Sequence, residues 1–333
     1  MRRLFSAVTT VALALGLAAP VSATCAGHNL FSDMEPARLA EIEASAQGFP
    51  FASGNFWRAT RGEEVITIAG TYHFDDPRHD PAIAALTPHI VAASTVLVEA
   101  GPDEEKALMA LIARDPSVMV ITAGPTLKEQ LPAEIWDPLA KALTDRGIPP
   151  FMSAKFQPWY VLTLLSIPPC AMSAMTTKPK GLDGLVIDAA LQAGVPVRGL
   201  EPFDTVFSIF DGMSPEELTE MLVSTLAIEA MSEDYFTTLV DSYFAGESRK
   251  AWELMRFVSY DMPGYTRDQI DAEFARMEEH VSSARNRAWI PVLTEAAAQG
   301  PVFAAFGALH LSGQDGVLNL LQKEGFTVEA LPL

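Results

Sequence analysis

The sequence predicts an α/β fold in which a mixed, mostly parallel sheet is covered by helices. Short apolar runs alternate with helical segments and short polar connections up to about residue 201, and this alternation is typical of parallel sheets. From Ser214 to about Ala298 strand signals stop, whereas helix caps and helical periodicity continue. In addition, two apolar runs far apart in the sequence both end in Gly-x-x-His. We therefore expect one α/β domain over residues 24–333 that includes an inserted all-helical lobe at about 214–298.

The first half of the chain supplies a helix, a hairpin and then alternating helices and strands. Residues 55–60 and 64–69 are joined by the short polar connection Arg61-Gly62-Glu63, which predicts a β-hairpin. Pro102 followed by acids marks the start of a helix. The elements expected here are a helix at 33–46, the hairpin, a proline-punctuated loop at 75–81, a helix to about 93, a strand ending at Glu99 and a helix at 102–113.

The second half begins with helices and ends with two strands. Ser214, Pro215 and Glu217 combine an N-cap, a proline at the first helical position and a capping-box acid, so the predicted helical lobe has a well-marked start. The other elements expected are helices at 127–131, 134–145, about 155–167 and 181–193, a strand ending at Glu201, a strand from 301 that leads to His310, a helix at 315–324 and a terminal strand at 326–331.

The N-terminus has the features of a secretory signal peptide. Arg2 and Arg3 precede an apolar run over residues 4–19, and small residues lead to a cleavage site after Ala23. The run is shorter than the roughly 20 residues that a membrane span needs, and no later run reaches that length. We expect an exported protein without a membrane span in the mature chain, located in the periplasm or, as a second choice, secreted.

The net charge and the cysteine content of the chain indicate which classes of partner and which redox compartment to expect. Removing the predicted leader deletes two arginines and no acid, which leaves 21 basic residues against 42 acidic ones, a net charge of −21. Nucleic acid and anionic membrane surfaces are therefore not expected partners. Cys25 and Cys170 are the two cysteines; in an exported chain such a pair predicts a disulfide, with two separate free thiols as the alternative.

The two Gly-x-x-His sequences are the main candidates for a functional site. His73 and His310 each follow a predicted buried strand, and Glu99 and Glu201 stand at the ends of two further strands. Sites in open α/β sheets lie at the C-terminal edge of the strands. Two imidazoles with Glu99, and with Asp183 or Glu201 behind them, are ligands that suit Zn, Mn, Co or Fe. The alternative is that the histidines are half-buried loop residues and the acids are solvated strand ends.

The sequence lacks the motifs of several large enzyme classes. It contains no Gly-x-Ser-x-Gly elbow, no His-Glu-x-x-His helix, no P-loop and no Rossmann glycine fingerprint. Cys170 as a nucleophile has no histidine paired with it in sequence. The usual hydrolase and nucleotide-binding classes are therefore not supported.

Several of these motifs together resemble the TraB/GumN family, which includes the animal TIKI proteins. The matching stretches are Gly70-Thr71-Tyr72-His73, Val98-Glu99, Pro196-Val197-Arg198-Gly199-Leu200-Glu201, Arg285-Asn286 and Gly307-Ala308-Leu309-His310-Leu311-Ser312-Gly313-Gln314-Asp315-Gly316. The resemblance implies an α/β fold similar to the erythromycin-esterase-like and ChaN-like superfamily and, as in TIKI proteins, a metal-dependent peptidase. It also implies that an Arg-Asn pair on a helix faces the site; here Arg287 follows Asn286, so either arginine is a candidate.

The combined expectation is an exported metal-dependent hydrolase, a peptidase above all, that acts on a peptide or small acyl substrate. His73, His310 and Glu99 would hold a divalent metal, which is Mn, Co or Zn. Glu99, Arg285 and Asn286 would act in catalysis, with Arg285 stabilising an oxyanion. The alternative is a periplasmic protein of the same fold that binds a metal or small ligand without turnover, because that function needs the same ligands.

Overall fold

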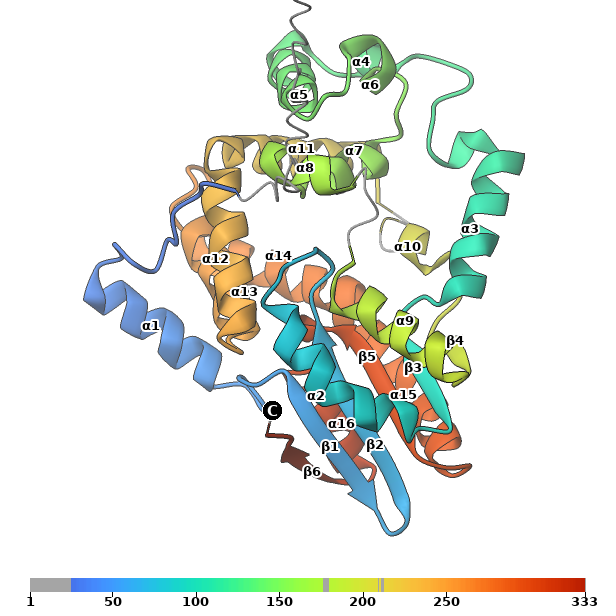
Figure 1. Cartoon of the computed structure of the whole chain (residues 1–333). Helices are drawn as coiled ribbons and strands as arrows, with labels where there is room; N and C mark the ends of the chain where they lie inside the picture. Colours follow the sequence, from blue (N-terminus) through green and yellow to red (C-terminus); the bar gives the residue numbers. More distant parts are fainter. Residues whose placement is uncertain (1–24, 176–179, 209, 211–212, 333) are drawn as a thin grey trace, which may run out of the picture.

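A computed structural model describes residues 25–175, 180–208, 210 and 213–332. Helices surround a single twisted sheet, and further helices extend above one end of it (Figure 1). The predicted cleavage site after Ala23 and the signal peptide lie outside the described residues.

Six strands form the sheet in the order β4-β3-β5-β2-β1-β6. Strands β2, β3, β4 and β5 run parallel, whereas β1 is antiparallel to both β2 and β6. This arrangement confirms the predicted mixed, mostly parallel sheet and the predicted hairpin. The strands are β1 (Phe56–Arg61), β2 (Glu64–Thr71), β3 (Thr95–Val98), β4 (Val197–Gly199), β5 (Val302–Gly307) and β6 (Thr327–Ala330).

Helices occupy most of the remaining chain. Those before the middle of the sequence are α1 (Pro36–Gln47), α2 (His79–Val91), α3 (Pro102–Arg114), α4 (Leu127–Gln130), α5 (Ala133–Asp145), α6 (Pro150–Ser153), α7 (Pro158–Leu165) and α8 (Pro169–Met175). Those after it are α9 (Leu182–Ala193), α10 (Thr205–Ser208), α11 (Pro215–Ala227), α12 (Ser232–Phe244), α13 (Ser248–Ser259), α14 (Arg267–Glu278), α15 (Ala284–Ala297) and α16 (Val317–Lys323). Short turns are η1 (Pro116–Val118), η2 (Glu229–Met231), the π-helical η3 (Glu279–Ser283) and η4 (Ala308–His310).

The inner strands β2, β3 and β5 are buried on both faces, which explains why they are continuous apolar runs and do not alternate. Helices α2 and α9 cover one face, where Val96, Val98 and Phe303 pack against them. On the other face α15 and α16 cover the sheet, and Trp289 packs there among sheet residues such as Phe306. The sheet is thus the middle layer of an α/β/α arrangement.

A second hydrophobic core lies in the helices above the sheet end. It is formed by α4, α5, α7 and α11, and Trp136 and Leu222 are buried in it. Residues 214–298 are helical as predicted, with no strand among them. Their packing partners differ: α11 belongs to this second core, α13 packs on α1 and α15 packs on the sheet. Helical periodicity identified each helix but did not show what each buried face contacts.

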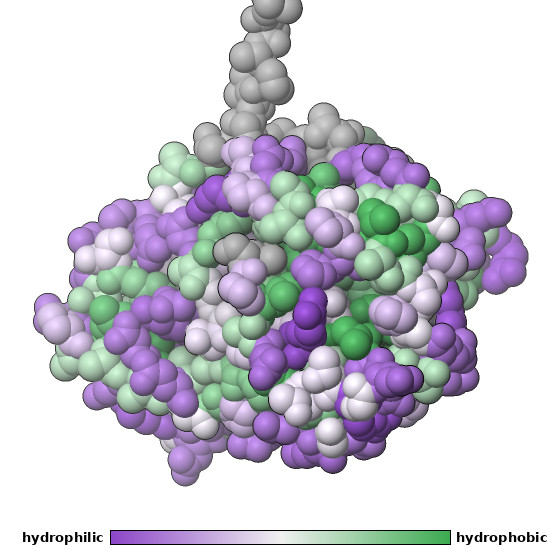
Figure 2. All heavy atoms as spheres, turned by 60° about the horizontal axis from the view of Figure 1, so that its bottom comes forward, coloured by the Kyte–Doolittle hydropathy of each residue, from purple (hydrophilic) through white to green (hydrophobic). Residues whose placement is uncertain are grey.

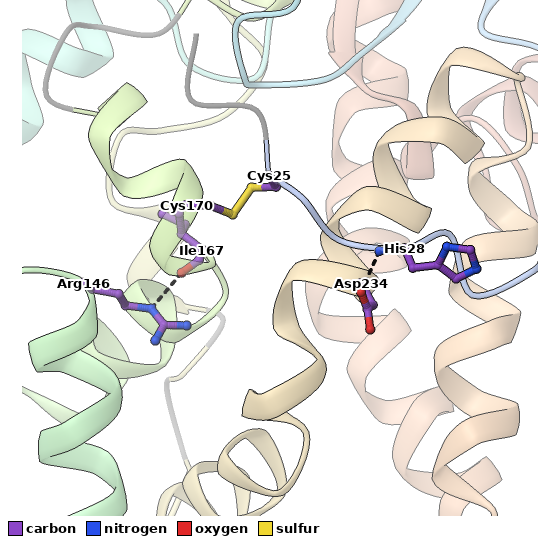
Figure 3. The surroundings of a disulfide bond; sticks show 6 residues. All are labelled: Cys25, His28, Arg146, Ile167, Cys170 and Asp234. Carbon is purple, nitrogen blue, oxygen red and sulfur yellow. Dashed lines mark hydrogen bonds between the residues drawn. A yellow bond between two sulfur atoms is a disulfide. The ribbon is translucent and has the colours of Figure 1, made fainter. Parts of the chain in front are cut away.

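The N-terminal strap, residues 25–34, links this helical region to the body of the molecule. Cys25 forms a disulfide with Cys170 in α8, as predicted, with the two Cα atoms 5.2 Å apart (Figure 3). Beyond it the His28 amide donates a hydrogen bond to Asp234 at 2.6 Å, and the Leu30 amide donates to Thr238 at 2.8 Å. The strap is therefore held by one covalent bond and by hydrogen bonds to α12.

Near the disulfide, a buried arginine fixes the ends of two helices. Arg146 follows α5, and its guanidinium donates to the Ile167 carbonyl at 2.7 Å, as Figure 3 shows, and to the carboxylate of Glu229. Further bonds go to the carbonyls of Leu164 and Leu165 at the end of α7. Since the last carbonyls of a helix lack partners within the helix, Arg146 satisfies groups that would otherwise be buried without hydrogen bonds.

Polar and apolar residues are mixed on one face of the molecule (Figure 2). Figure 2, which turns the lower end of Figure 1 toward the reader, shows hydrophilic and hydrophobic residues interspersed over this face. Among the described residues, no helix has both the length and the apolar character that crossing a bilayer requires.

We expect removal of the disulfide to destabilise the protein through the unfolded state. Cys25 and Cys170 are 145 residues apart in sequence, and in the chain-entropy model a loop of this length corresponds to about 4 to 5 kcal/mol. The double variant Cys25→Ser/Cys170→Ser should unfold at a lower urea concentration, and its free energy of unfolding should be smaller by that amount. Two titratable thiols in the native parent protein would contradict the bond.

Candidate functional site

Three strand ends define the site. In the sheet β5 lies between β2 and β3, and Thr71 of β2 is in register with Gly307 of β5. His73 follows β2, Glu99 follows β3, and His310 lies in the turn η4 directly after β5. The sheet pairing brings these three predicted ligands to one edge, as expected from the sequence.

The three side chains surround one small space beside Gly307. A Cβ atom placed on Gly307 would lie 3.2 Å from Glu99 Oε1, 3.7 Å from His310 Cδ2 and 3.9 Å from His73 Nε2. The first motif also needs its glycine: a Cβ on Gly70 would lie 2.6 Å from Leu311, so a side chain there would push away the turn that carries His310.

Asn286 sets the tautomer of the buried His310. The Asn286 Nδ2 group donates to the carbonyl of Asp315 at 2.8 Å, which turns Oδ1 toward His310 Nδ1 at 2.6 Å. An amide oxygen only accepts, so His310 Nδ1 carries the hydrogen and Nε2 keeps its lone pair. The predicted catalytic Asn286 thus positions His310 and is itself buried.

Asp183 plays the corresponding part for His73. It lies in the first turn of α9, and its Oδ2 is 3.2 Å from His73 Nδ1. The hydrogen bond and charge of Asp183, with the charge of Glu99, raise the pKa of His73 to about 9. The His73 side chain is 61% exposed, so water screens this ion pair and its contribution to stability is small.

The two histidines therefore differ in protonation although they come from similar motifs. Burial lowers the pKa of His310 to about 4, with the Arg285 and His73 charges adding to the effect against that of Glu99. At neutral pH His310 is an unprotonated base, whereas His73 is protonated. Paired groups with pKa values moved apart are typical of acid and base roles in catalysis.

Glu99 is held ionised between a backbone amide and a guanidinium. Its Oε1 accepts from the Gly307 amide at 2.6 Å, and its Oε2 accepts from Arg285 Nη2 at 2.8 Å. Burial alone would raise the pKa of Glu99. In the acidic range where this carboxyl group titrates, however, His310 and His73 are both protonated, and their charges, the Arg285 charge and the Gly307 hydrogen bond lower the pKa to about 2.

Of the two candidate arginines, Arg285 faces the site. It forms a bidentate pair with Glu201, at 2.7 and 2.9 Å, and its Nη1 donates to the Val281 carbonyl in the π-helical turn η3. Arg287 instead pairs with Glu279 and Asp315 near the surface. Every nitrogen of Arg285 is thus engaged by a neighbour, an arrangement suited to holding Glu99 in place.

Trp289 is a site residue that the sequence analysis missed. Its indole Nε1 donates to Glu201 Oε2 at 3.0 Å, and its ring lies 4.5 Å from the His310 ring between centroids. The helical spacing could have predicted it. Trp289 is four residues after Arg285 and three after Asn286, which places it on the face of α15 that carries these two residues.

His73, Glu99 and His310 are residue types that bind divalent cations, but their side chains are not positioned around a common point at ligand distances. His310 has a fixed lone pair on Nε2, but Arg285 Nη1 is 3.4 Å from it and Glu99 Oε1 is 3.9 Å away. Across the described ranges, no group of three or more His, Cys, Asp and Glu side chains is placed to hold a metal. Bringing the three ligands onto one cation therefore requires these side chains to shift from their present positions.

We expect Asp183→Asn to lower the pKa of His73 from about 9 toward its ordinary value of 6.5, because the carboxylate is the main cause of the increase. Since the folded-state pKa is raised, the His73–Asp183 pair stabilises the protein fully below about pH 6.5, and this contribution is lost as the pH rises toward 9. A ¹⁵N-edited NMR titration of His73 in the parent protein and in the Asp183→Asn variant measures the change. An unchanged His73 titration would show that Asp183 does not hold the imidazolium.

We expect Trp289→Phe to weaken the hold on Glu201 while keeping an aromatic ring against His310. The lost hydrogen bond is to a charged group and corresponds to about 1.5 to 3 kcal/mol of unfolding free energy. Trp252→Phe on α13, where the indole packs edge-on against Phe274, is the matched control and should cost less. Equal losses in urea denaturation would contradict the role of the indole N–H.

Similarity of the chain to known proteins lies at the level of the family. None of the curated proteins matches the chain. The family model of the TraB/PrgY/gumN family matches residues 55–330, which include both Gly-x-x-His motifs, Glu99 and Arg285. Because this match covers most of the sequence, the chain belongs to the TraB/PrgY/gumN family.

Proposed function

We propose that this protein is a periplasmic hydrolase that cleaves a peptide or similar acyl bond and uses a divalent cation held by His73, Glu99 and His310. The observation that carries the proposal is the convergence of these three side chains on the space beside Gly307. The Cys25–Cys170 disulfide is compatible with an oxidising compartment.

The charges around that space support a divalent cation. Glu99, Glu201 and Asp183 supply three negative charges, and Arg285 supplies one positive charge. With both imidazoles neutral, the cluster has a net charge of −2, which a divalent ion would balance. Binding would require His73 to give up its proton, because ligating imidazoles are neutral.

The chain's own residues then have distinct tasks. Asn286 and Asp183 hold the Nδ1 atoms of the two imidazoles, which leaves the Nε2 atoms as the ligating atoms. His310 Nε2 would exchange its 3.4 Å contact with Arg285 Nη1 for the cation. Glu201 keeps Arg285 beside Glu99, and Arg285 orients that carboxylate and balances its charge. A bound cation would supply a Lewis acid and lower the pKa of a water molecule.

Replacing Gly307 tests this proposal most sharply. The backbone at Gly307 has φ −50° and ψ 136°, which alanine adopts without strain, and its amide still donates to Glu99. The added methyl group would fill the space between the ligands. We expect Gly307→Ala to fold normally and to bind Mn, Co or Zn at least about a hundredfold more weakly in calorimetry, since outer-shell changes alone cost 10- to 100-fold.

Gly184→Ala is the matched control, since a Cβ there meets Lys180 only at 3.7 Å. It should bind cations as the parent does. If the parent binds no Mn, Co or Zn, or if Gly307→Ala binds them equally well, the cation site is not the one proposed.

A binding protein without turnover is the second candidate. The ligands must move to reach one cation, and such a movement on binding serves the capture of a cation as well as catalysis. Screening a peptide library with each cation separates the two. A hydrolase gives cleaved peptides with the parent and none with His310→Ala, whereas a binding protein takes up the cation and leaves every peptide intact.

A further inference from the structure

We propose that the cavity beside His73 selects substrates by a small aliphatic group next to an amide, with Ile187 and Thr71 as the residues that set this preference. The proposal deepens the proposed function and rests on it for the reaction, but the binding that it describes does not require a cation. It concerns the space between the C-terminal sheet edge and the start of α9.

The size of the cavity limits what it accepts. Its volume is about 170 Å³, whereas sites for drug-sized ligands measure about 300 to 1,000 Å³. A cavity of about 150 Å³ binds one benzene molecule, which has six non-hydrogen atoms, so this cavity holds a ligand of about that size. A whole peptide does not fit, but a single short side chain with its amide does.

The exposed lining of the cavity is mainly apolar, although His73 and Glu99 also contribute to its walls. Val98 and Ala305 approach from the sheet, and Ile187 approaches from α9, four residues after Asp183 and so on the same helix face. Ala100 lies at the exposed side. The size of the Ile187 side chain therefore limits how large a group can enter between the sheet and α9.

The polar end of the ligand is indicated by two oxygens without partners. Thr71 Oγ1 and Asp183 Oδ1 are buried and have no hydrogen-bond partner among the described residues, and both residues line this cavity. Thr71 is 3% exposed, so bulk water does not satisfy its hydroxyl group. A hydroxyl donor and a carboxylate acceptor complement the C=O and N–H of one amide group.

The test measures binding of small amides to the protein without added cation, using NMR of ¹³C-labelled Ile and Ala methyl groups. Isobutyramide should shift the Ile187 and Ala305 signals and bind about tenfold more tightly than phenylacetamide, which is too large. Methyl isobutyrate, which lacks the N–H, should bind more weakly still, because sites built for an N–H reject analogues without it.

Three variants assign the roles. Ile187→Ala should admit phenylacetamide and reverse the order of affinities. Thr71→Val keeps the shape but removes the hydroxyl group, and should weaken isobutyramide binding about fivefold. Leu191→Ala, one turn further along α9 and 55% exposed, should behave as the parent.

Binding that is absent, that does not depend on ligand size, or that is unaffected by Ile187→Ala and Thr71→Val would overturn the proposal. Size-selective amide binding by a protein that takes up no cation would support this inference while refuting the proposed cation site. Cation binding without amide selectivity would do the reverse.

Discussion

The parallel pairing of β2, β5 and β3 is the constraint on which the rest of the molecule depends. Thr71 opposite Gly307, and Val98 opposite Ala305, fix how far each strand extends toward the common edge. A shift by one residue would move buried side chains to the opposite face and carry the attached loop about 3.3 Å along the sheet. Each face packs side chains of particular sizes against its own helices, so this packing selects the register. The register in turn determines which polar side chains meet.

Electrostatics at the edge follow from which partner each imidazole finds. Both histidines come from the same short motif, but a carboxylate from α9 faces His73 and a neutral amide from α15 faces His310. The first environment stabilises a positive charge, whereas the second leaves a buried neutral ring. Arg285 supplies the fixed positive charge of the site, and Glu201 and Trp289 keep it from moving away.

Local patterns predicted those parts of the structure whose cause is local. The hairpin, the strands that deliver His73, Glu99 and His310, and the helices of residues 214–298 follow from apolar runs, turn residues and caps. The partners of distant segments could not be predicted this way. The bidentate pair of Arg285 joins residues 84 positions apart, and the second core combines α5 and α7 with α11, which follows them only after α9 and β4. The choice between Arg285 and Arg287 likewise depends on helical phase after the π-helical turn.

The strap also bears on the order in which the chain can assemble. Its hydrogen-bond partners on α12 lie more than 200 residues later in the sequence, and Cys170 precedes them. During synthesis the first residues of the strap thus emerge long before any surface exists to receive them. Contacts of such long range close slowly, because much of the chain must be ordered first. A disulfide to Cys170 formed earlier would keep the strap near its final place until α12 folds.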